Sequence, residues 1–250
     1  MNRFENQTAV ITGGAQGIGL SIGRKLAFEG AKIWIFDMDE ETARGAVEAM
    51  GEEGLKVDYA KVDITSEASV EGGFEAVADA GDTVQIVVNS AGIVGPSNLR
   101  TEEVPLEGFE KTIAVNLTGS FLMLKYALKA MAPQNYGRIL LIASIAGKEG
   151  NAGMVSYSSS KAGVIGMVKA AGKEYAETGI TVNGLAPAVI RTAMVENMPE
   201  AQVKYMTDKI PMKRCGTLDE VANLAAWIVS EESSFNTAFT FDMTGGRAVY

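Results

Sequence analysis

The sequence predicts an α/β fold, in which a doubly wound parallel sheet of about seven strands carries helices on both faces. Two observations predict it. Short apolar runs rich in β-branched residues alternate with longer segments of helical periodicity along the 250-residue chain. The runs are also hydrophobic at nearly every position, which is typical of parallel strands buried on both faces. A sheet of this kind binds its ligands at the carboxyl ends of its strands.

In chain order, the expected strands are Thr8–Ile11, Lys32–Phe36, Leu55–Val62, Val84–Val88, Arg138–Ile142, Ile180–Leu185 and Ala238–Phe241. Helices are expected between them, and an example of their apolar stripes is formed by Ala43, Ala46, Val47 and Met50. No linker, low-complexity segment or repeat interrupts the alternation. We therefore expect residues 1–250 to form a single domain.

The composition excludes several classes of function. The net charge of −9 disfavours nucleic acid and anionic membranes as partners. No apolar run is long enough to span a membrane, and the first residues lead directly into a strand, so we expect a cytoplasmic protein. The chain has no histidine and only Cys215, which argues against a Ser-His-Asp hydrolase, a disulfide framework and a metal site. Acid–base chemistry must therefore use Tyr, Lys, Asp or Glu.

A glycine-rich turn, Thr12–Gly19, follows the first expected strand and leads into an expected helix, Leu20–Glu29. Glycines at this place allow backbone N–H groups to approach a pyrophosphate at a helix N-terminus. The spacing is Gly-x3-Gly-x-Gly, which differs from the commonest dinucleotide fingerprint. Because the turn is the first strand-to-helix connection of an alternating chain, we interpret it as a dinucleotide site.

Asp37 ends the second expected strand, about twenty residues beyond the glycines, where a carboxylate can accept hydrogen bonds from adenosine ribose hydroxyls. It would repel a 2′-phosphate, and no Arg or Lys stands at positions 15, 16 or 38 to bind one. Its alternative role is to cap the next helix, although Asp39 is better placed for that. NAD is therefore favoured over NADP.

Polar residues also follow later strands. Asp63 ends the third strand, Asn89–Gly92 follows the fourth, and Ser144 follows the fifth, where it faces the ligand crevice or forms a simple hydroxyl turn. Asn116 lies within an expected helix, Leu106–Met131, and its alternative role is a structural hydrogen bond. The Met-rich segment Ala193–Ile210 is weakly periodic, so we expect a mobile lid at about residues 190–212.

Tyr157 and Lys161 are four residues apart, so a helix places them on one face. An ammonium about 4 Å from a phenolate stabilises it by about 4 kcal/mol at an effective dielectric constant of about 20. That energy corresponds to about three pKa units, enough to bring a phenol toward the range of a general base. The alternative is an exposed pair that arises by chance.

In this order, Thr12–Gly19, Asn89–Gly92, Asn116, Ser144 and the Tyr157/Lys161 pair resemble the short-chain dehydrogenase/reductase family along essentially the whole chain. The resemblance implies a single Rossmann-type domain, a nicotinamide cofactor and hydride transfer between an alcohol and a ketone. It also implies four catalytic roles. Tyr157 would be the general acid and base, and Lys161 would bind the nicotinamide ribose and lower the pKa of the tyrosine. Ser144 would orient the substrate oxygen, and Asn116 would support a water relay.

The same resemblance implies a set of cofactor contacts. They are Gly13, Gln16, Gly17, Ile18, Gly19, Asp37, Met38, Asp63, Ile64, Asn89, Ala91, Gly92, Tyr157, Lys161, Pro187, Ile190 and Thr192. The chain departs from the family pattern at three places. Ser90 replaces a second Asn, Ala188 replaces a Gly and would narrow the pocket, and Val84-Gln85 replaces the usual Asp.

The substrate is less constrained. Many relatives are 3-oxoacyl-carrier-protein reductases that use NADP and bind an acidic carrier, but here the chain is acidic and Asn135 and Thr178 stand where such enzymes tend to carry Arg. The ending Gly245-Gly246-Arg247-Ala248-Val249-Tyr250 instead resembles that of sugar-acid dehydrogenases. We therefore favour a sugar acid, such as a 2-keto-3-deoxy acid, over a neutral sugar, polyol or other small alcohol.

A sugar acid needs a cation for its carboxylate, and Lys148 and Arg191 could each provide one, their alternative being solvated surface charge. The residues expected to line the substrate site are Lys148, Arg191, Met194 and Tyr250. A catalytically silent NAD-binding protein is a further alternative, which the complete catalytic set argues against.

We also expect a homotetramer. The expected helix Met154–Glu177 presents a small, flat face at Gly163, Gly166, Ala170 and Ala171, and relatives pair this helix across two-fold axes. The end of the chain, Arg247–Tyr250, is expected either to fray or to close the pocket of a neighbouring subunit.

Overall fold

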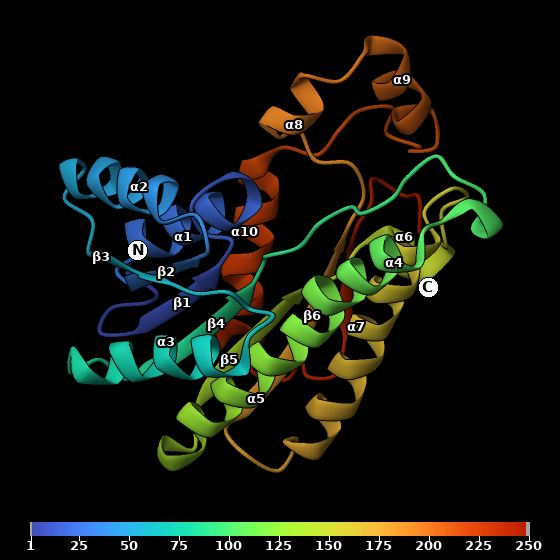
Figure 1. Ribbon diagram of the computed structural model, residues 1–250. Helices are drawn as coiled ribbons and strands as arrows, with labels where there is room; N and C mark the ends of the chain where they lie inside the picture. Colours follow the sequence, from blue (N-terminus) through green and yellow to red (C-terminus); the bar gives the residue numbers. More distant parts are fainter. Residues whose placement is uncertain (1, 249–250) are drawn as a thin grey trace.

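The computed structural model describes residues 2–248, apart from the side chain of Met194, and contains one seven-stranded parallel sheet (Figure 1). The strand order is β3-β2-β1-β4-β5-β6-β7. The strands are β1 (Thr8–Thr12), β2 (Lys32–Asp37), β3 (Val57–Lys61), β4 (Val84–Asn89), β5 (Gly137–Ile142), β6 (Ile180–Pro187) and β7 (Thr240–Met243). The order reverses between β1 and β4, which opens a ligand crevice at their carboxyl ends. The predicted fold class is confirmed.

Helices cover both faces of the sheet (Figure 1). The helices α1, α2 and α10 pack on one face, and α3, α5 and α7 pack on the other. Their bounds are α1 (Gly17–Phe28), α2 (Glu40–Glu52), α3 (Glu67–Asp79), α4 (Leu106–Ile113), α5 (Gly119–Met131), α6 (Ile145–Glu149), α7 (Val155–Glu174), α8 (Ala193–Glu196), α9 (Glu200–Asp208) and α10 (Leu218–Ile228).

Each face of the sheet has its own hydrophobic core. Along β1, Val10 enters the core beneath α3, α5 and α7, while Ala9 and Ile11 enter the core beneath α1, α2 and α10. All five β1 residues are buried, as the continuous hydrophobicity of the run predicts. Full burial of one large apolar side chain stabilises the folded state by about 1.5–3 kcal/mol. The two cores therefore hold the strand ends in place.

Several element boundaries differ from the expected ones. Helix α1 begins at Gly17, not at Leu20, so the last two glycines of the turn belong to its first turn. Strand β3 begins at Val57, not at Leu55, because the Leu55 N–H donates to the Met50 carbonyl and closes the end of α2. Strand β7 begins at Thr240, because Ala238 has a φ of 60° that no strand accommodates.

The expected helix Leu106–Met131 is interrupted. Helices α4 and α5 are separated by a single π-helical turn, η2 (Ala114–Thr118), which has Asn116 at its centre. Wide turns of this kind are frequent at functional sites, because they displace side chains from the regular helical face.

Helix α7 does not present the expected small face in full. Ala171 is buried in the core beneath α5 and α7, and a Cβ on Gly163 would lie 2.7 Å from a Leu117 methyl group. Gly166 and Ala170 are exposed as predicted. The exposed strip of α7 is therefore narrower than the sequence indicated.

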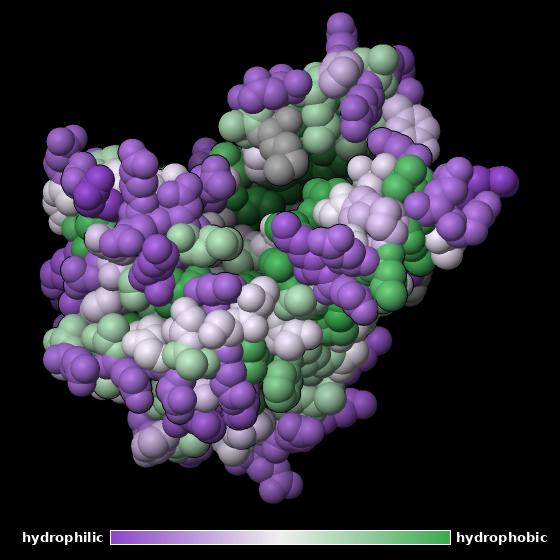
Figure 2. Space-filling model, viewed as in Figure 1, coloured by the Kyte–Doolittle hydropathy of each residue, from purple (hydrophilic) through white to green (hydrophobic). Residues whose placement is uncertain are grey.

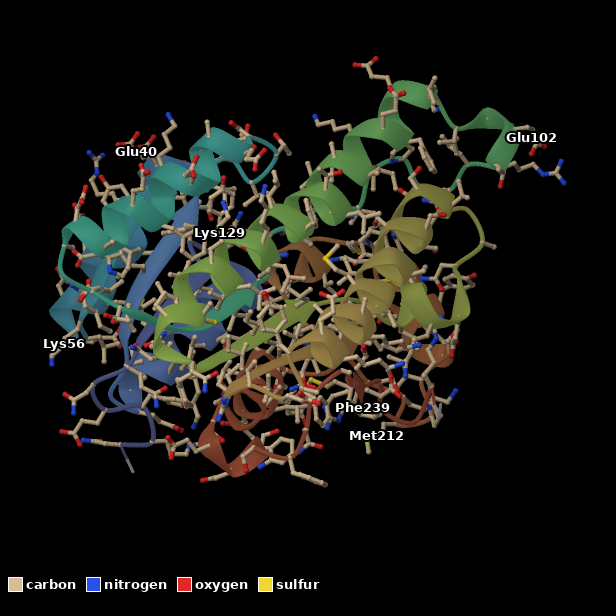
Figure 3. All side chains as sticks on the ribbon, turned by 90° about the horizontal axis from the view of Figure 1, so that it is seen from below. Glu40, Lys56, Glu102, Lys129, Met212 and Phe239 are labelled. Carbon is tan, nitrogen blue, oxygen red and sulfur yellow. The ribbon has the colours of Figure 1, made fainter. Side chains whose placement is uncertain are left out.

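Helices α8 and α9 stand above the carboxyl edge of the sheet, over the segment where the lid is expected (Figure 1). Viewed from below, Glu102, in the 3-10 turn η1 (Thr101–Glu103), and Lys56, before β3, lie at opposite ends of the molecule (Figure 3). Among residues 2–248, no helix is both long and apolar enough to cross a membrane.

Candidate active site

Ser144 lies directly after β5, at the carboxyl edge of the sheet. Its backbone is extended, and its hydroxyl oxygen accepts a hydrogen bond of 3.1 Å from the Ala146 N–H, which caps helix α6. The residue is buried. Both sequence interpretations therefore apply, because the hydroxyl caps a turn and also lies at the strand end that faces the crevice.

Tyr157 and Lys161 lie on the first two turns of α7. The Lys161 side chain is only 4% exposed, and its Nζ donates a hydrogen bond of 2.8 Å to the Ile142 carbonyl at the end of β5. The same Nζ lies 5.8 Å from the centre of the Tyr157 ring. The helix thus brings both groups to the edge of β5, as the spacing predicts.

Burial controls the ionisation of this pair. Burial lowers the pKa of Lys161 to about 8, because a charged ammonium is poorly solvated there. Burial also raises the pKa of Tyr157, and a hydrogen bond from the Ser144 side chain opposes that rise. We expected Lys161 to lower the pKa of Tyr157, but the pKa is raised and Lys161 is not among the causes of its shift. The ammonium bonds to Ile142, and the group that stabilises the phenolate is Ser144.

Asn116 is fully buried in the π-helical turn η2, and both its side-chain oxygen and its side-chain nitrogen are hydrogen bonded. Its Oδ1 accepts from the Ile93 N–H, while its Nδ2 donates to the Ile93 carbonyl and to Ser160 Oγ, at 2.8, 2.8 and 3.0 Å. Ser160 Oγ in turn donates to the Tyr157 carbonyl at 2.8 Å. Asn116 therefore joins the loop after β4 to helix α7, which is the structural role that the sequence left open.

A second buried network fixes the loop after β4. Thr12 Oγ1 donates to Asn89 Oδ1 at 2.7 Å and accepts from the Ser90 and Ala91 N–H groups, each at 3.1 Å. Asn89 Nδ2 donates to Ser120 Oγ at 2.8 Å. Sequence reasoning missed Thr12 and Ser120. Thr12 carried a signal, since a hydroxyl residue stands at the strand end beside the glycine turn, whereas Ser120 carried none.

The glycine turn forms a cradle at the N-terminus of α1. Gly13 has a φ of 59°, and a Cβ there would lie 3.0 Å from the Ala91 backbone. A Cβ on Gly19 would lie 2.2 Å from the Gly13 carbonyl oxygen. Gly17 also has a left-handed φ, of 57°, but its Cβ position has no atom of the described residues within 4 Å. The turn is thus tightly packed at Gly13 and Gly19, and it has open space at Gly17.

The open end of this cradle suits an anion. The exposed side chain of Gln16, at the N-cap of α1, makes no capping hydrogen bond within the described part of the chain. The first N–H groups of a helix need acceptors, and a pyrophosphate supplies them. The residues present therefore fit a dinucleotide.

Asp37, at the end of β2, lies beside the cradle. Its carboxylate accepts from the Ala15 N–H at 3.3 Å and from the Asp39 N–H at 3.2 Å. Asp39 caps α2 by accepting from the Thr42 N–H, which confirms that Asp37 is not the cap. Met38 is 67% exposed, so this end of the crevice is open to solvent.

The other predicted cofactor residues lie along the same edge. Asp63 accepts hydrogen bonds from Thr65, while the Ile64 side chain is buried against Gly119. A Cβ on Gly92 would lie 3.5 Å from Lys161 Nζ, so the loop passes close to the lysine. Pro187 ends β6, and Ile190 bridges to Gly216.

Comparison with known proteins decides the family. A family model described as enoyl-(acyl carrier protein) reductase matches residues 13–247. The 2-dehydro-3-deoxy-L-rhamnonate dehydrogenase (NAD(+)) of Sphingomonas sp. (strain SKA58) is 37% identical over 248 residues, which cover 99% of this chain and 98% of the relative. The chain belongs to the short-chain dehydrogenase/reductase family.

Other members of this family are similar over nearly their full length. The 3-oxoacyl-[acyl-carrier-protein] reductase FabG of Aquifex aeolicus (strain VF5) is 34% identical over 98% of both chains. The crystal structure of an NAD+-bound xylitol dehydrogenase has a TM-score of 0.92 and 30% identity, and the match covers 97% of this chain and 99% of that one. As a short-chain dehydrogenase/reductase, the protein is a nicotinamide-dependent oxidoreductase.

This dehydrogenase/reductase has a hollow between the lid helices and the body, with largely apolar walls and polar side chains at its rim (Figure 2). Pockets that bind small molecules are typically apolar with a few polar groups. Of the residues predicted to contact substrate, Arg191 is exposed. Tyr250 and the side chain of Met194 lie outside the described residues.

Lys148 and the tail of this enzyme differ from expectation. Lys148 Nζ forms an ion pair of 2.8 Å with Asp242, and its side chain is only 10% exposed, so it is not a solvated surface charge. Arg247 forms an ion pair of 2.8 Å with Glu149, and Ala248 is buried. The alternative that the tail frays is therefore wrong for these two tail residues.

Proposed function

We propose that this protein is an NAD-dependent dehydrogenase that interconverts the secondary alcohol and the ketone of a small polar substrate, most favourably a sugar acid such as a 2-keto-3-deoxy acid, or otherwise a sugar. One observation carries the proposal. The Ser144 hydroxyl follows β5 at the carboxyl edge of the sheet, the buried Lys161 Nζ lies 5.8 Å from the centre of the Tyr157 ring, and hydrogen bonding by Ser144 lowers the pKa of Tyr157 against burial. Proton transfer by a positioned phenol is an effective form of general acid–base catalysis.

The chain's residues divide the work of the reaction. In alcohol oxidation, Ser144 holds the substrate hydroxyl, and the Tyr157 oxygen takes its proton as the carbinol carbon loses a hydride. A bound nicotinamide would supply the acceptor for that hydride. Lys161, whose Nζ lies 5.8 Å from the centre of the Tyr157 ring, would bind the nicotinamide ribose, and Asn116 would support a water relay behind it. Reduction reverses each step, so Tyr157 then gives its proton to the carbonyl oxygen.

The remaining predicted contacts hold the cofactor. Gly17, Ile18 and Gly19 present N–H groups to the pyrophosphate, and Asp37 binds the adenosine ribose hydroxyls. Asp63, two residues beyond β3, and the strand ends at Asn89 and Pro187 form the rest of the crevice. Residues 190–212 act as the lid that excludes water.

The choice of a sugar acid is supported by the relative and by Arg191. The rhamnonate-derived substrate in the name of the Sphingomonas relative is a 2-keto-3-deoxy acid, and the similarity extends over 99% of this chain. Arg191 is exposed next to Ile190, where it can bind a substrate carboxylate.

A 3-oxoacyl-carrier-protein reductase is the second candidate, favoured by the similarity to the Aquifex enzyme. Asn135 and Thr178, the positions that tend to carry Arg in such enzymes, lie in adjoining turns, where Asn135 Oδ1 accepts from the Gly179 N–H at 3.2 Å. These turns therefore offer no cation at either position to an acidic carrier.

A scan of NADH formation across sugars, sugar acids, polyols and steroids tests the function. We expect the highest kcat/KM with a sugar acid and NAD. A faster reduction of a 3-oxoacyl thioester with NADPH would favour the second candidate. No turnover of any compound would favour a catalytically silent NAD-binding protein.

Cofactor preference gives a separate prediction. Asp37 repels a 2′-phosphate, so kcat/KM should be at least about tenfold higher with NAD than with NADP, the effect of roughly 1.4 kcal/mol. Replacing Asp37 with Ala and Met38 with Arg together should shift the preference toward NADP, because the repulsion is removed and a cation is added. Equal use of both cofactors by the wild-type enzyme would contradict the role of Asp37.

We further propose a homotetramer and a single cytoplasmic domain. The exposed Gly166 and Ala170 of α7 leave room for a second helix, and Phe121 of α5 is 49% exposed. Closed tetramers commonly have dihedral symmetry. A monomer in light scattering at micromolar concentration would contradict the assembly.

A further inference from the structure

The segment after β7 contacts two parts of the molecule that carry the candidate site. On one side, the Gly245 carbonyl accepts a hydrogen bond of 3.2 Å from the Met212 N–H at the end of the lid segment. Gly245 has a φ of 59°, and a Cβ there would lie 2.7 Å from an Ile210 methyl group. The Met212 side chain itself points away from the body (Figure 3). On the other side, the last two residues of β7 and the segment after it contact α6, and we call these residues, 242–248, the strap.

Two ion pairs join the strap to consecutive residues of α6. Lys148 pairs with Asp242 and Glu149 pairs with Arg247, each at 2.8 Å. Arg247 Nη2 also donates to Asn151 Oδ1 at 2.9 Å. The guanidinium therefore contacts both Glu149, at the end of α6, and the loop that follows. The Lys148 and Arg247 side chains are only 10% and 11% exposed, so solvent screens these pairs less than surface pairs.

Helix α6 needs such support. It has five residues, and isolated helices of that length are unstable because nucleation is costly. Ser144 is its N-cap. The loop beyond it is tied to α7, since the Asn151 N–H donates to Ser158 Oγ at 3.0 Å, one residue after Tyr157. The strap therefore contacts the segment between Ser144 and Tyr157 at Lys148, Glu149 and Asn151.

We propose that Arg247 is a positioning residue, which acts through Glu149 and Asn151, with the Lys148–Asp242 pair beside it, to hold the Ser144 hydroxyl against the Tyr157 phenol. The strap thereby couples the end of the lid segment to the catalytic serine. The inference rests on the proposed function only in taking Ser144 and Tyr157 as the reacting groups. It gives Lys148 a role in place of a contact with the substrate carboxylate.

The charges around the phenol make the pH profile a sensitive readout. Lys161 faces Tyr157 from α7, while on α6 Lys148 and Glu149 face the strap residues Asp242 and Arg247. The hydrogen bond from Ser144 lowers the pKa of Tyr157 against the effect of burial. Loosening α6 should weaken that bond and raise the phenol pKa. Alcohol oxidation, which uses the phenolate, should then need a higher pH.

The test compares Arg247→Met with a matched variant, Arg24→Met, which removes a half-exposed Arg–Glu pair between α1 and Glu53. Arg247→Met should lower kcat about tenfold, because small misplacements of reacting groups are costly. It should move the midpoint of the oxidation pH profile upward and leave the Kd for NAD within about twofold of wild type. Arg24→Met should change none of these quantities.

Two further measurements keep the proposal falsifiable. Reversing the pair with Arg247→Glu and Glu149→Arg should recover most of the lost kcat and the pH midpoint. Hydrogen exchange of the α6 amides, which needs no substrate, should accelerate in Arg247→Met but not in Arg24→Met. Unchanged exchange in α6 would overturn the proposal whatever the substrate scan gives. A lower Tm with wild-type kcat and pH midpoint would also overturn it, since the strap would then serve stability alone.

Discussion

Replacing Tyr157 with Phe should lower kcat by a factor of 10² or more, the usual scale of acid–base catalysis. The substitution keeps the ring and removes the phenolic oxygen, which exchanges a proton with the substrate in the proposed mechanism. Because the ring is half-buried at the edge of β5 and phenylalanine fills the same space, the Kd for NAD should change little. The measurement is kcat in both directions with NAD binding followed separately.

The pH dependence of the wild-type enzyme provides the second part of this prediction. Burial raises the pKa of Tyr157, so the phenol is protonated at neutral pH. Oxidation requires the phenolate and should accelerate as pH rises, whereas reduction requires the phenol and should slow over the same range. The Tyr157→Phe variant should lose this dependence along with its turnover.

A matched substitution separates chemistry from packing. Tyr136 is also half-buried, and burial also raises its pKa, but it lies before β5, away from the crevice. Tyr136→Phe should retain wild-type kcat. Near-normal turnover of Tyr157→Phe would exclude the proposed mechanism.

The sequence predicted those features that depend on local pattern. All five residues of β1 are apolar or small and all are buried, so the strand could be found without knowledge of its neighbours. The Tyr157–Lys161 spacing placed both groups at one edge because helical geometry is fixed over four residues. The predicted ends of the strands were less accurate. The Leu55 N–H bonds to Met50 and Ala238 has a left-handed φ, and the pattern of apolar residues indicates neither.

Features that depend on distant partners could not be predicted. Asn116 bonds to Ile93 and Ser160, which are 23 and 44 residues away, and these bonds accompany the π-helical turn. Lys148 pairs with Asp242, 94 residues away, and that distance hid its internal role. The sign of the Tyr157 pKa shift was also missed, because it depends on burial and on Ser144 more than on the spacing of Lys161.

Lys161→Met should abolish most activity. The free energy of unfolding of the variant minus that of wild type should nevertheless be greater at neutral pH than at alkaline pH. In the folded protein, burial lowers the pKa of Lys161 from 10.5 to about 8. A shift of that size corresponds to about 3 kcal/mol of destabilisation while the lysine is charged in both states. Methionine has a similar length and carries no charge, so it removes this cost. It also removes the donor to the Ile142 carbonyl, which offsets the gain by about 1–3 kcal/mol.

The pH dependence isolates the charge term, because the change in stability with pH depends only on the difference between the pKa of Lys161 in the folded and the unfolded chain. Between about pH 8 and 10.5, the unfolded chain binds more protons at this lysine than the folded one, so wild-type stability gains with rising pH. The free energy of unfolding of Lys161→Met minus that of wild type should therefore fall by about 2 kcal/mol between pH 7 and pH 9.5. Urea unfolding at a fixed protein concentration measures it.

The control for this experiment is Lys56→Met, because Lys56 is exposed in the loop before β3. Its difference from wild type should not vary over the same pH range. In Lys161→Met, kcat should fall by at least the acid–base scale of about 10², and NAD binding should weaken, because the proposed ligand of the nicotinamide ribose is lost. A pH-independent stability difference would mean that Lys161 is not destabilised by burial. The expected fall with pH would instead mean that burying this lysine lowers stability in exchange for function, as is common for active-site charges.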